Sequence, residues 1–163
     1  MWISNSRSAL LLLVLLMNRA TQNIILIIIA CFLFVCAIYI YISSRDEDMI
    51  LYTWLGIDYH NSAFEYVRNH TCCLSNWMKY NLPDGLWLCS FLLFMEGIWG
   101  KEKYWKWLFC VLIIAFAFII EIMQYNGLFP GTGDFWDLIS YISAFLLFLL
   151  FIKLKQMYYE KNT

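Results

Sequence analysis

Residues 24–42 of the chain read IILIIIACFLFVCAIYIYI, an apolar run without a single charged side chain. At about 1.5 Å per residue, a helix of this length crosses the roughly 30 Å hydrocarbon core of a bilayer. The run ends at Ser43, Ser44 and Arg45, where polar side chains return. The sequence therefore predicts a transmembrane helix over this segment.

The composition of the whole chain agrees with a membrane protein. Of its 163 residues, 63% are hydrophobic and only 14% are charged, whereas soluble domains carry about a quarter charged residues. A formal net charge of −1 argues against a nucleic-acid partner, because binding a phosphate backbone requires a concentrated basic surface. The length suits one domain, and we expect membrane lipid to be its main surrounding.

Further apolar runs extend this first span into a bundle. They cover residues 83–99, 104–125 and 135–152, and the first of these begins at Pro83, which can open a helix in its first turn. Residues 43–82 are too polar to cross a bilayer but rich in aromatic side chains, which favour the membrane interface. We predict an all-α integral membrane bundle of four transmembrane helices, with residues 43–82 as short extracytoplasmic interfacial helices.

Lysine and arginine in the short flanks set the expected orientation. Basic residues gather before the first span, between the second and third, and after the fourth: Arg7, Arg19, Lys101, Lys103, Lys106, Lys153, Lys155 and Lys161. Such residues are enriched in cytoplasmic loops. Both termini are therefore predicted to be cytoplasmic, with residues 24–153 as the membrane domain and residues 154–163 as a tail.

The first 23 residues contain a short apolar run, ALLLLVLLM, at positions 9–17. It resembles the apolar region of a signal peptide but lacks a small-residue cleavage site. Cleavage would also send the lysines after the second span to the wrong side of the membrane. We interpret residues 1–23 as an uncleaved cytoplasmic extension and expect it to be dispensable.

Polar and charged residues recur at the ends of the spans on the predicted outer side. They are Arg45, Asp84, Glu121, Gln124, Asp134 and Asp137. Residues of these types near hydrocarbon are energetically costly and often functional. Glu121 and Gln124 share one helix face, as do Asp134, Asp137 and then Tyr141, and the short connection over residues 126–133 makes their two helices antiparallel neighbours. We expect a polar cluster there.

A purely structural interpretation exists for several of these side chains. Asp134 and Asp84 stand where helices begin, so both suit the positive helix N-terminus. Glu121 lies near a helix C-terminus, which disfavours an anion, so we expect it to need a partner, with Arg45 paired to Glu121 or Asp137. Glu96, near the inner end of the second span, is interpreted as a surface ion pair facing Lys101 and Lys103.

The sequence contains none of the common catalytic motifs. It has no Ser-His-Asp order, phosphate loop or zinc-binding His-Glu-x-x-His helix. His60 and His70 lack the spacing of metal ligands. Four of the six cysteines, Cys31, Cys36, Cys89 and Cys110, lie inside apolar runs as packing residues. We predict no cofactor and no resident metal.

The second half of the chain contains EIMQ at residues 121–124, PGTGDFWDL at residues 130–138, and the small residues Ser143 and Ala144 in the last span. In these motifs it resembles the VanZ-like family, small membrane proteins named for a teicoplanin-resistance factor. The segment LPDGLW at residues 82–87, at the entry to the second span, is similar to that of some bacterial relatives.

This resemblance implies a protein of the bacterial inner membrane and cell envelope, with a link to antibiotic resistance. The implied ligand is a lipid-linked or glycopeptide-type envelope molecule bound at the outer polar cluster, with Arg45, Asp84, Glu121, Gln124, Asp134, Asp137 and Tyr141 as its residues. Two alternatives remain open. The same carboxylates could serve an enzyme as acid and base or hold a hard cation, or the cluster could only fix helix pairing in an accessory subunit.

Overall fold

The computed structural model describes residues 19–44, 52, 56, 58–70, 74–100, 102–129 and 133–161. Helices make up nearly all of these residues, which include no β-strand. The helices are α2 (Arg19–Ser44), α4 (Ser62–His70), α5 (Asn76–Tyr80), α6 (Leu82–Trp99), α7 (Lys103–Tyr125) and α8 (Phe135–Lys161). Several features predicted from the sequence lie outside the described residues: Arg45, Lys101, residues 1–18 and residues 130–132 of the connection between α7 and α8.

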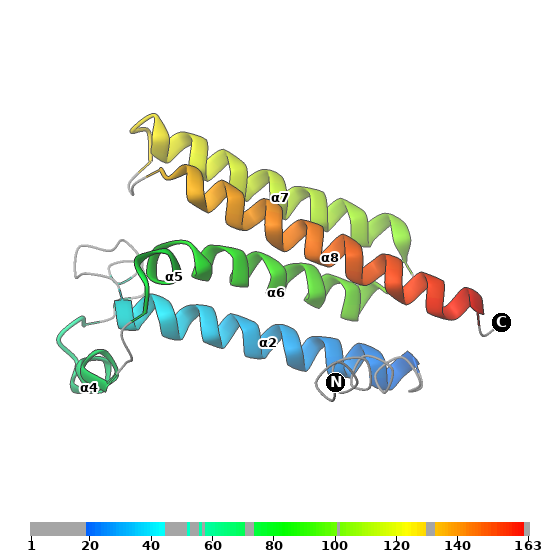
Figure 1. Ribbon diagram of the computed structural model, residues 1–163, viewed down its shortest axis with the longest axis horizontal. Helices are drawn as coiled ribbons and strands as arrows, with labels where there is room; N and C mark the ends of the chain where they lie inside the picture. The colour runs from blue at the N-terminus through cyan, green and yellow to red at the C-terminus, as the bar shows by residue number, and fades with distance from the viewer. Residues whose placement is uncertain are drawn as a thin grey trace, which may run out of the picture.

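Helix α6 occupies the middle of the bundle, with α2 on one side and α7 and α8 on the other (Figure 1). Its contact with α2 is built on small residues. Ala30 is almost completely buried, and the Ser90 hydroxyl donates a 2.8 Å hydrogen bond to its carbonyl. A Cβ at Gly97 would lie 2.8 Å from Ile27 Cγ1. Small residues and hydrogen bonds of this kind are typical of helix contacts in membranes, where the hydrophobic effect does not drive association.

A second set of buried side chains joins α6 to α7 and α8. It consists of Leu88, Leu92, Cys110, Ala117, Tyr141, Ala144, Phe148 and Ile152. Cys110 is a free thiol inside this core, as expected for a packing residue. The Trp107 ring meets Phe148 edge-on, with centroids 6.3 Å apart. These contacts hold α7 and α8 against α6 as one core.

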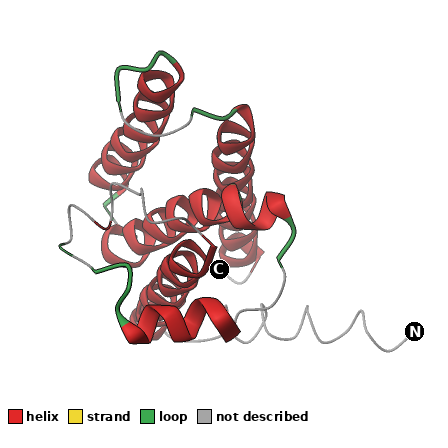
Figure 2. Cartoon of the chain, turned by 90° about the vertical axis from the view of Figure 1, so that its left-hand side faces the viewer, coloured by secondary structure: helices red, strands yellow, loops and turns green. Residues whose placement is uncertain are grey.

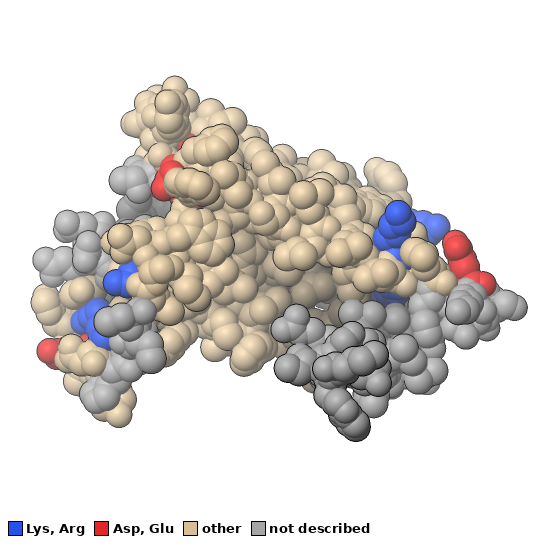
Figure 3. All heavy atoms as spheres, viewed as in Figure 1, with Lys and Arg blue, Asp and Glu red and all other residues tan. Residues whose placement is uncertain are grey.

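The outer surface of the long helices is apolar. Large side chains such as Phe32, Phe116 and Leu147 are each at least 60% exposed, an arrangement that water would penalise and lipid would not. Within the described part of the chain, three helical segments are long and apolar enough to cross a membrane: Ala20–Ser44, Lys103–Tyr125 and Phe135–Met157. Figure 3 shows charged side chains at the two ends of the visible face and none across its middle. The chain therefore has the features of a multi-pass membrane protein.

The two ends of the bundle differ in charge. One end, here called the acidic end, carries Asp84, Glu121, Asp134 and Asp137, where α6 and α8 begin and α7 finishes. The other, the lysine end, carries Lys103, Lys106, Lys153 and Lys155. The short helices α4 and α5 lie crosswise at the acidic end (Figures 1 and 2).

Side-chain contacts organise this crosswise layer. Arg68 Nη2 donates a 2.7 Å hydrogen bond to the Tyr59 carbonyl, and its guanidinium lies 3.8 Å from the centre of the Tyr59 ring. Tyr52 is buried edge-on against Tyr59, and its hydroxyl lies 3.4 Å from the Ile42 carbonyl of α2. Burial raises the pKa of Tyr52, with the nearby Arg68 opposing that change. The layer is thereby attached to the end of α2.

The helices extend beyond the predicted spans. Helix α2 begins at Arg19, so residues 19–23 of the predicted extension belong to it. Helix α8 continues past Ile152 to Lys161, through the predicted tail. Hydropathy detects the part of a helix that suits hydrocarbon, but the backbone remains helical beyond it, where Gln22 is buried and Lys155 forms an ion pair with Glu96.

Candidate functional site

The turn between α7 and α8 brings the ends of these two helices close together. Gly127 has a φ of +68°, a left-handed conformation that favours glycine at the end of a helix. At Gly133 the constraint is space rather than conformation, because an added Cβ would overlap the Tyr125 backbone, lying only 2.6 Å from its Cα. The C-terminal end of α7 therefore lies directly beside the start of α8.

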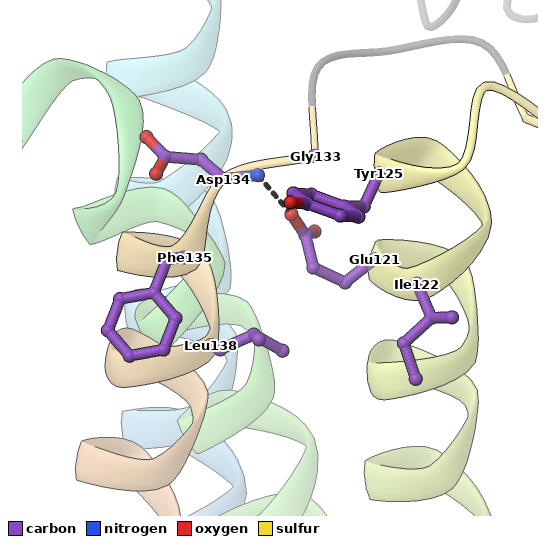
Figure 4. Close-up of a pocket in the computed structure, with 7 residues that line it drawn as sticks. All are labelled: Glu121, Ile122, Tyr125, Gly133, Asp134, Phe135 and Leu138. Atoms are coloured by element: carbon purple, nitrogen blue, oxygen red, sulfur yellow. Dashed lines mark hydrogen bonds between the residues drawn. The ribbon is translucent and has the colours of Figure 1, made fainter.

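Because the two helix ends lie close together, the Glu121 carboxylate reaches a hydrogen-bond donor at the start of α8. Its side chain reaches from α7 toward α8, and Oε1 accepts a 2.5 Å hydrogen bond from the backbone N–H of Asp134 (Figure 4). The residue is only 4% exposed. Its own helix C-terminus disfavours a negative charge, but the positive N-terminal end of α8 favours it. The Asp134 backbone N–H is thus one partner of the Glu121 carboxylate; the predicted pairing with Arg45 lies outside the described residues.

Asp134 is the N-cap of α8. Its Oδ1 accepts a 3.1 Å hydrogen bond from the backbone N–H of Trp136, two residues on. A side-chain oxygen that accepts from the second helical N–H is the usual N-cap interaction. In Figure 4 the Asp134 carboxylate points away from Glu121. The capping interpretation made from the sequence is therefore confirmed for this residue.

Asp84 links α6 to α8. Its Oδ1 lies 3.3 Å from both Trp87 Nε1 and the Tyr141 hydroxyl, and each of these groups donates to it. The rings of Trp87 and Tyr141 meet edge-on with centroids 5.8 Å apart. Tyr141 lies one turn beyond Asp137 on α8, and its hydroxyl donates its hydrogen bond across to Asp84 of α6.

Asp137 joins a neighbouring contact that the sequence analysis did not foresee. It is 8% exposed, and its Oδ1 accepts a 3.2 Å hydrogen bond from Asn81 Nδ2, just before α6. The Ser140 hydroxyl, on the next turn of α8, is buried without a hydrogen-bond partner in the described part of the chain. The position of Asn81, beside the Pro-Asp start of α6, was the only sequence signal for its role.

A cavity of about 320 Å³ opens between α7 and α8 at this end (Figure 4). It is lined by Glu121, Ile122, Tyr125, Gly133, Asp134, Phe135 and Leu138. Most of its wall is apolar, with the Glu121 carboxylate as a buried polar group at its edge. A site of this kind suits a ligand with both an apolar and a polar part.

The structure thus gathers Asp84, Glu121, Asp134, Asp137 and Tyr141 at the acidic end. Gln124 lies one turn beyond Glu121 on α7, half-buried, and does not line the cavity. Among the described residues, no three His, Cys, Asp or Glu side chains converge closely enough to hold a metal ion. Each of the four carboxylates at this end instead accepts hydrogen bonds from its own donor groups.

The prediction for Glu96 was wrong. This residue is not at the surface but 3% exposed, and its carboxylate lies 2.8 Å from Lys106 Nζ and 2.7 Å from Lys155 Nζ. The sequence analysis assigned it to Lys101 and Lys103 because they are near in sequence. Lys155 comes from another helix, which local spacing does not reveal.

Comparison of the chain with protein-family models, with curated proteins and with solved structures found no match.

Proposed function

We propose that this chain is a VanZ-like protein of the bacterial inner membrane that binds an amphiphilic cell-envelope ligand at its acidic end. The ligand class is a lipid-linked or glycopeptide-type molecule. The proposal combines the family resemblance of residues 121–138 with one structural observation. That observation is the carboxylate of Glu121 at the edge of an apolar cavity between α7 and α8.

In this proposal α6 also crosses the membrane, which brings the number of transmembrane helices to four. It is shorter than its neighbours at 18 residues, and it carries the polar residues Asp84, Ser90 and Glu96. These polar groups point to protein partners: Tyr141, the Ala30 carbonyl and the two lysines. A central helix that satisfies its polar groups inside the bundle need not be as apolar as a helix facing lipid.

The acidic end then faces outward and both termini lie in the cytoplasm. The support is the position of the lysines, which flank the bundle at the opposite end. The crosswise helices α4 and α5 would rest at the outer membrane interface, where exposed aromatic side chains such as Tyr66 and Trp77 are favoured.

The chemistry of the cavity defines what the ligand must offer. Ile122, Phe135 and Leu138 can contact a hydrocarbon chain or an apolar ring. Glu121 uses Oε1 for the bond to Asp134, which leaves Oε2 for a hydroxyl, amide or ammonium donor of the ligand. Lipid-linked sugars and glycopeptides carry such donors next to apolar parts.

A cavity-filling variant tests the proposal without altering any charge. Leu138→Trp would fill the space between α7 and α8, whereas Leu146→Trp, on the same helix, adds the same ring at a position 58% exposed. Binding of teicoplanin and of a polyprenyl-linked sugar to the detergent-solubilised chain would be followed by thermal shift. We expect at least one probe to stabilise wild type and Leu146→Trp but not Leu138→Trp.

Two results would contradict the proposal. One is that neither probe stabilises the wild-type chain. The other is that Leu138→Trp binds as well as Leu146→Trp. Either would favour the accessory-subunit alternative, in which the bonds of Asp84 and Asp137 only fix how α6 and α8 pair.

A further inference from the structure

A separate charged site lies at the lysine end, away from the proposed ligand cavity. Its centre is Glu96 of α6, and its cations come from two other helices, Lys106 of α7 and Lys155 of α8. The side chains of Glu96 and Lys106 are 3% and 8% exposed, and that of Lys155 is 15% exposed. Three helices thus contribute charges to one nearly buried group.

This group contains two buried ammonium groups but only one carboxylate. Lys155 Nζ donates a hydrogen bond to Glu96 Oε1. Lys106 Nζ lies 2.8 Å from Oε2 as an ion pair, but the approach lacks hydrogen-bond geometry. Two ammonium groups share one carboxylate, so the group carries a net positive charge. Buried charge that is not balanced is costly, and a bound anion would remove that cost.

The space for such an anion is present. A cavity of about 500 Å³ is lined by Glu96, Lys106 and Lys155 together with Lys103, whose side chain is exposed. Amide side chains of Gln22, Asn23 and Gln156 also face it, and the exposed Glu160 lies on its wall. Three lysines against two carboxylates leave one positive charge in excess. The charged residues at this end are visible at the right of Figure 3.

The cavity lies at the level that the lipid headgroups of a membrane would occupy. The apolar segments Ala20–Ser44 and Lys103–Tyr125 begin at this end, and Phe135–Met157 finishes there. Lipid phosphates lie just beyond the ends of such segments. Basic pockets between transmembrane helices at this level are suited to anionic lipid headgroups.

We propose that the cavity bounded by Lys103, Lys106 and Lys155 binds a phosphate group, whose negative charge adds to that of Glu96 in balancing the lysines. The phosphate belongs to an anionic lipid headgroup or to a small phosphate ester in solution. The site is independent of the acidic end, so its failure would leave the proposed function untouched.

The test uses the full chain in detergent and native mass spectrometry. Phosphatidylglycerol is compared with phosphatidylcholine in the wild type, in Lys155→Gln, and in Lys153→Gln as the matched control. Lys153 is exposed on the same helix and does not line the cavity. We expect phosphatidylglycerol to be preferred, Lys155→Gln to weaken its binding about fivefold, and Lys153→Gln to leave it unchanged.

Glycerol 3-phosphate identifies the source of the phosphate. If it displaces phosphatidylglycerol, the site recognises the phosphate group itself. If it does not, while binding still depends on Lys155, the site needs the whole lipid. Equal binding of the two lipids by the wild type, or equal effects of Lys155→Gln and Lys153→Gln, would overturn the proposal.

Two further measurements do not depend on how well Lys155→Gln folds. Amine acetylation of the wild type should be slowed by phosphatidylglycerol at Lys103 and Lys155 but not at Lys153. In Glu96→Gln the two buried lysines lose their shared carboxylate, so we expect tighter phosphatidylglycerol binding and a melting temperature that depends strongly on this lipid. Unchanged acetylation at all three lysines, or a Glu96→Gln variant indifferent to the lipid, would contradict the site.

Discussion

Gly133→Ala is the substitution whose effect can be worked out most fully from the structure. The added Cβ would overlap two backbone atoms of Tyr125, its nitrogen and its Cα, the latter at 2.6 Å. Carbon atoms in ordinary contact are about 3.5 Å apart, so the two sides of the turn must separate by about 1 Å. That movement would pull the Asp134 N–H away from Glu121, 2.5 Å in the intact turn.

The expected cost has two parts. Overpacking costs about 1 to 3 kcal/mol, and losing a hydrogen bond to a charged group costs about 1.5 to 3 kcal/mol. Taking a total of about 3 kcal/mol, a chain of this size should melt about 6 to 12 °C lower. The measurement is thermal unfolding of the detergent-solubilised chain.

Gly127→Ala provides the matched control. It introduces the same methyl group at the other end of the turn, where nothing lies within 4 Å, so only the left-handed conformation is penalised, at about 1 to 2 kcal/mol. We expect Gly127→Ala to melt a few degrees below wild type and Gly133→Ala clearly lower. If Gly133→Ala melts within about 2 °C of wild type, the close approach of α7 and α8 is wrong.

The remaining predictions concern the α2–α6 contact, the cap and the topology. Ser90→Ala removes the 2.8 Å bond to the Ala30 carbonyl and should cost about 0.6 to 1.7 kcal/mol of unfolding free energy, whereas Ser143→Ala, at an exposed position, should be neutral; equal effects would contradict the role of that bond. Asp134→Asn should change the melting temperature little, because asparagine caps nearly as well, and Asp134→Ala should cost about 1 kcal/mol; a large loss in Asp134→Asn would show that its charge matters. Reporter domains should be read as external when inserted at Gly131 and as cytoplasmic at the C-terminus; a cytoplasmic signal at Gly131 would invert the proposed orientation.

The general fold was predictable because hydropathy reports directly on the solvent around a helix. The long runs of isoleucine, leucine and phenylalanine indicated the three spans that length and composition support. The ends of the helices were not predictable in this way. Lys155 appeared to leave the membrane with the tail, but it lies in α8 and its amine reaches Glu96.

The sequence predicted which residues belong to the candidate site, but not which of them contact one another. The dipole argument correctly identified Glu121 as a side chain in need of compensation, but it did not identify the Asp134 N–H as the partner. The Asp134 N–H reaches Glu121 because the chain turns closely at Gly133, and local sequence spacing does not reveal the path of that turn. The pairs Asn81 with Asp137 and Asp84 with Tyr141 span 56 and 57 residues, so no local spacing could have shown them.

The central claim, that the acidic end binds a ligand through Glu121, is tested most directly by Glu121→Gln. The amide oxygen can still accept from the Asp134 N–H, so folding should be retained while the charge is lost. Glu102→Gln, the same change at the opposite end of α7 on an exposed side chain, is the control.

The measurement is the affinity of the chain for whichever probe stabilises the wild type, with glycopeptide susceptibility of the cells recorded alongside. We predict that Glu121→Gln melts near wild type but binds about tenfold more weakly or worse, and that Glu102→Gln has no effect. Wild-type affinity in Glu121→Gln would contradict the account.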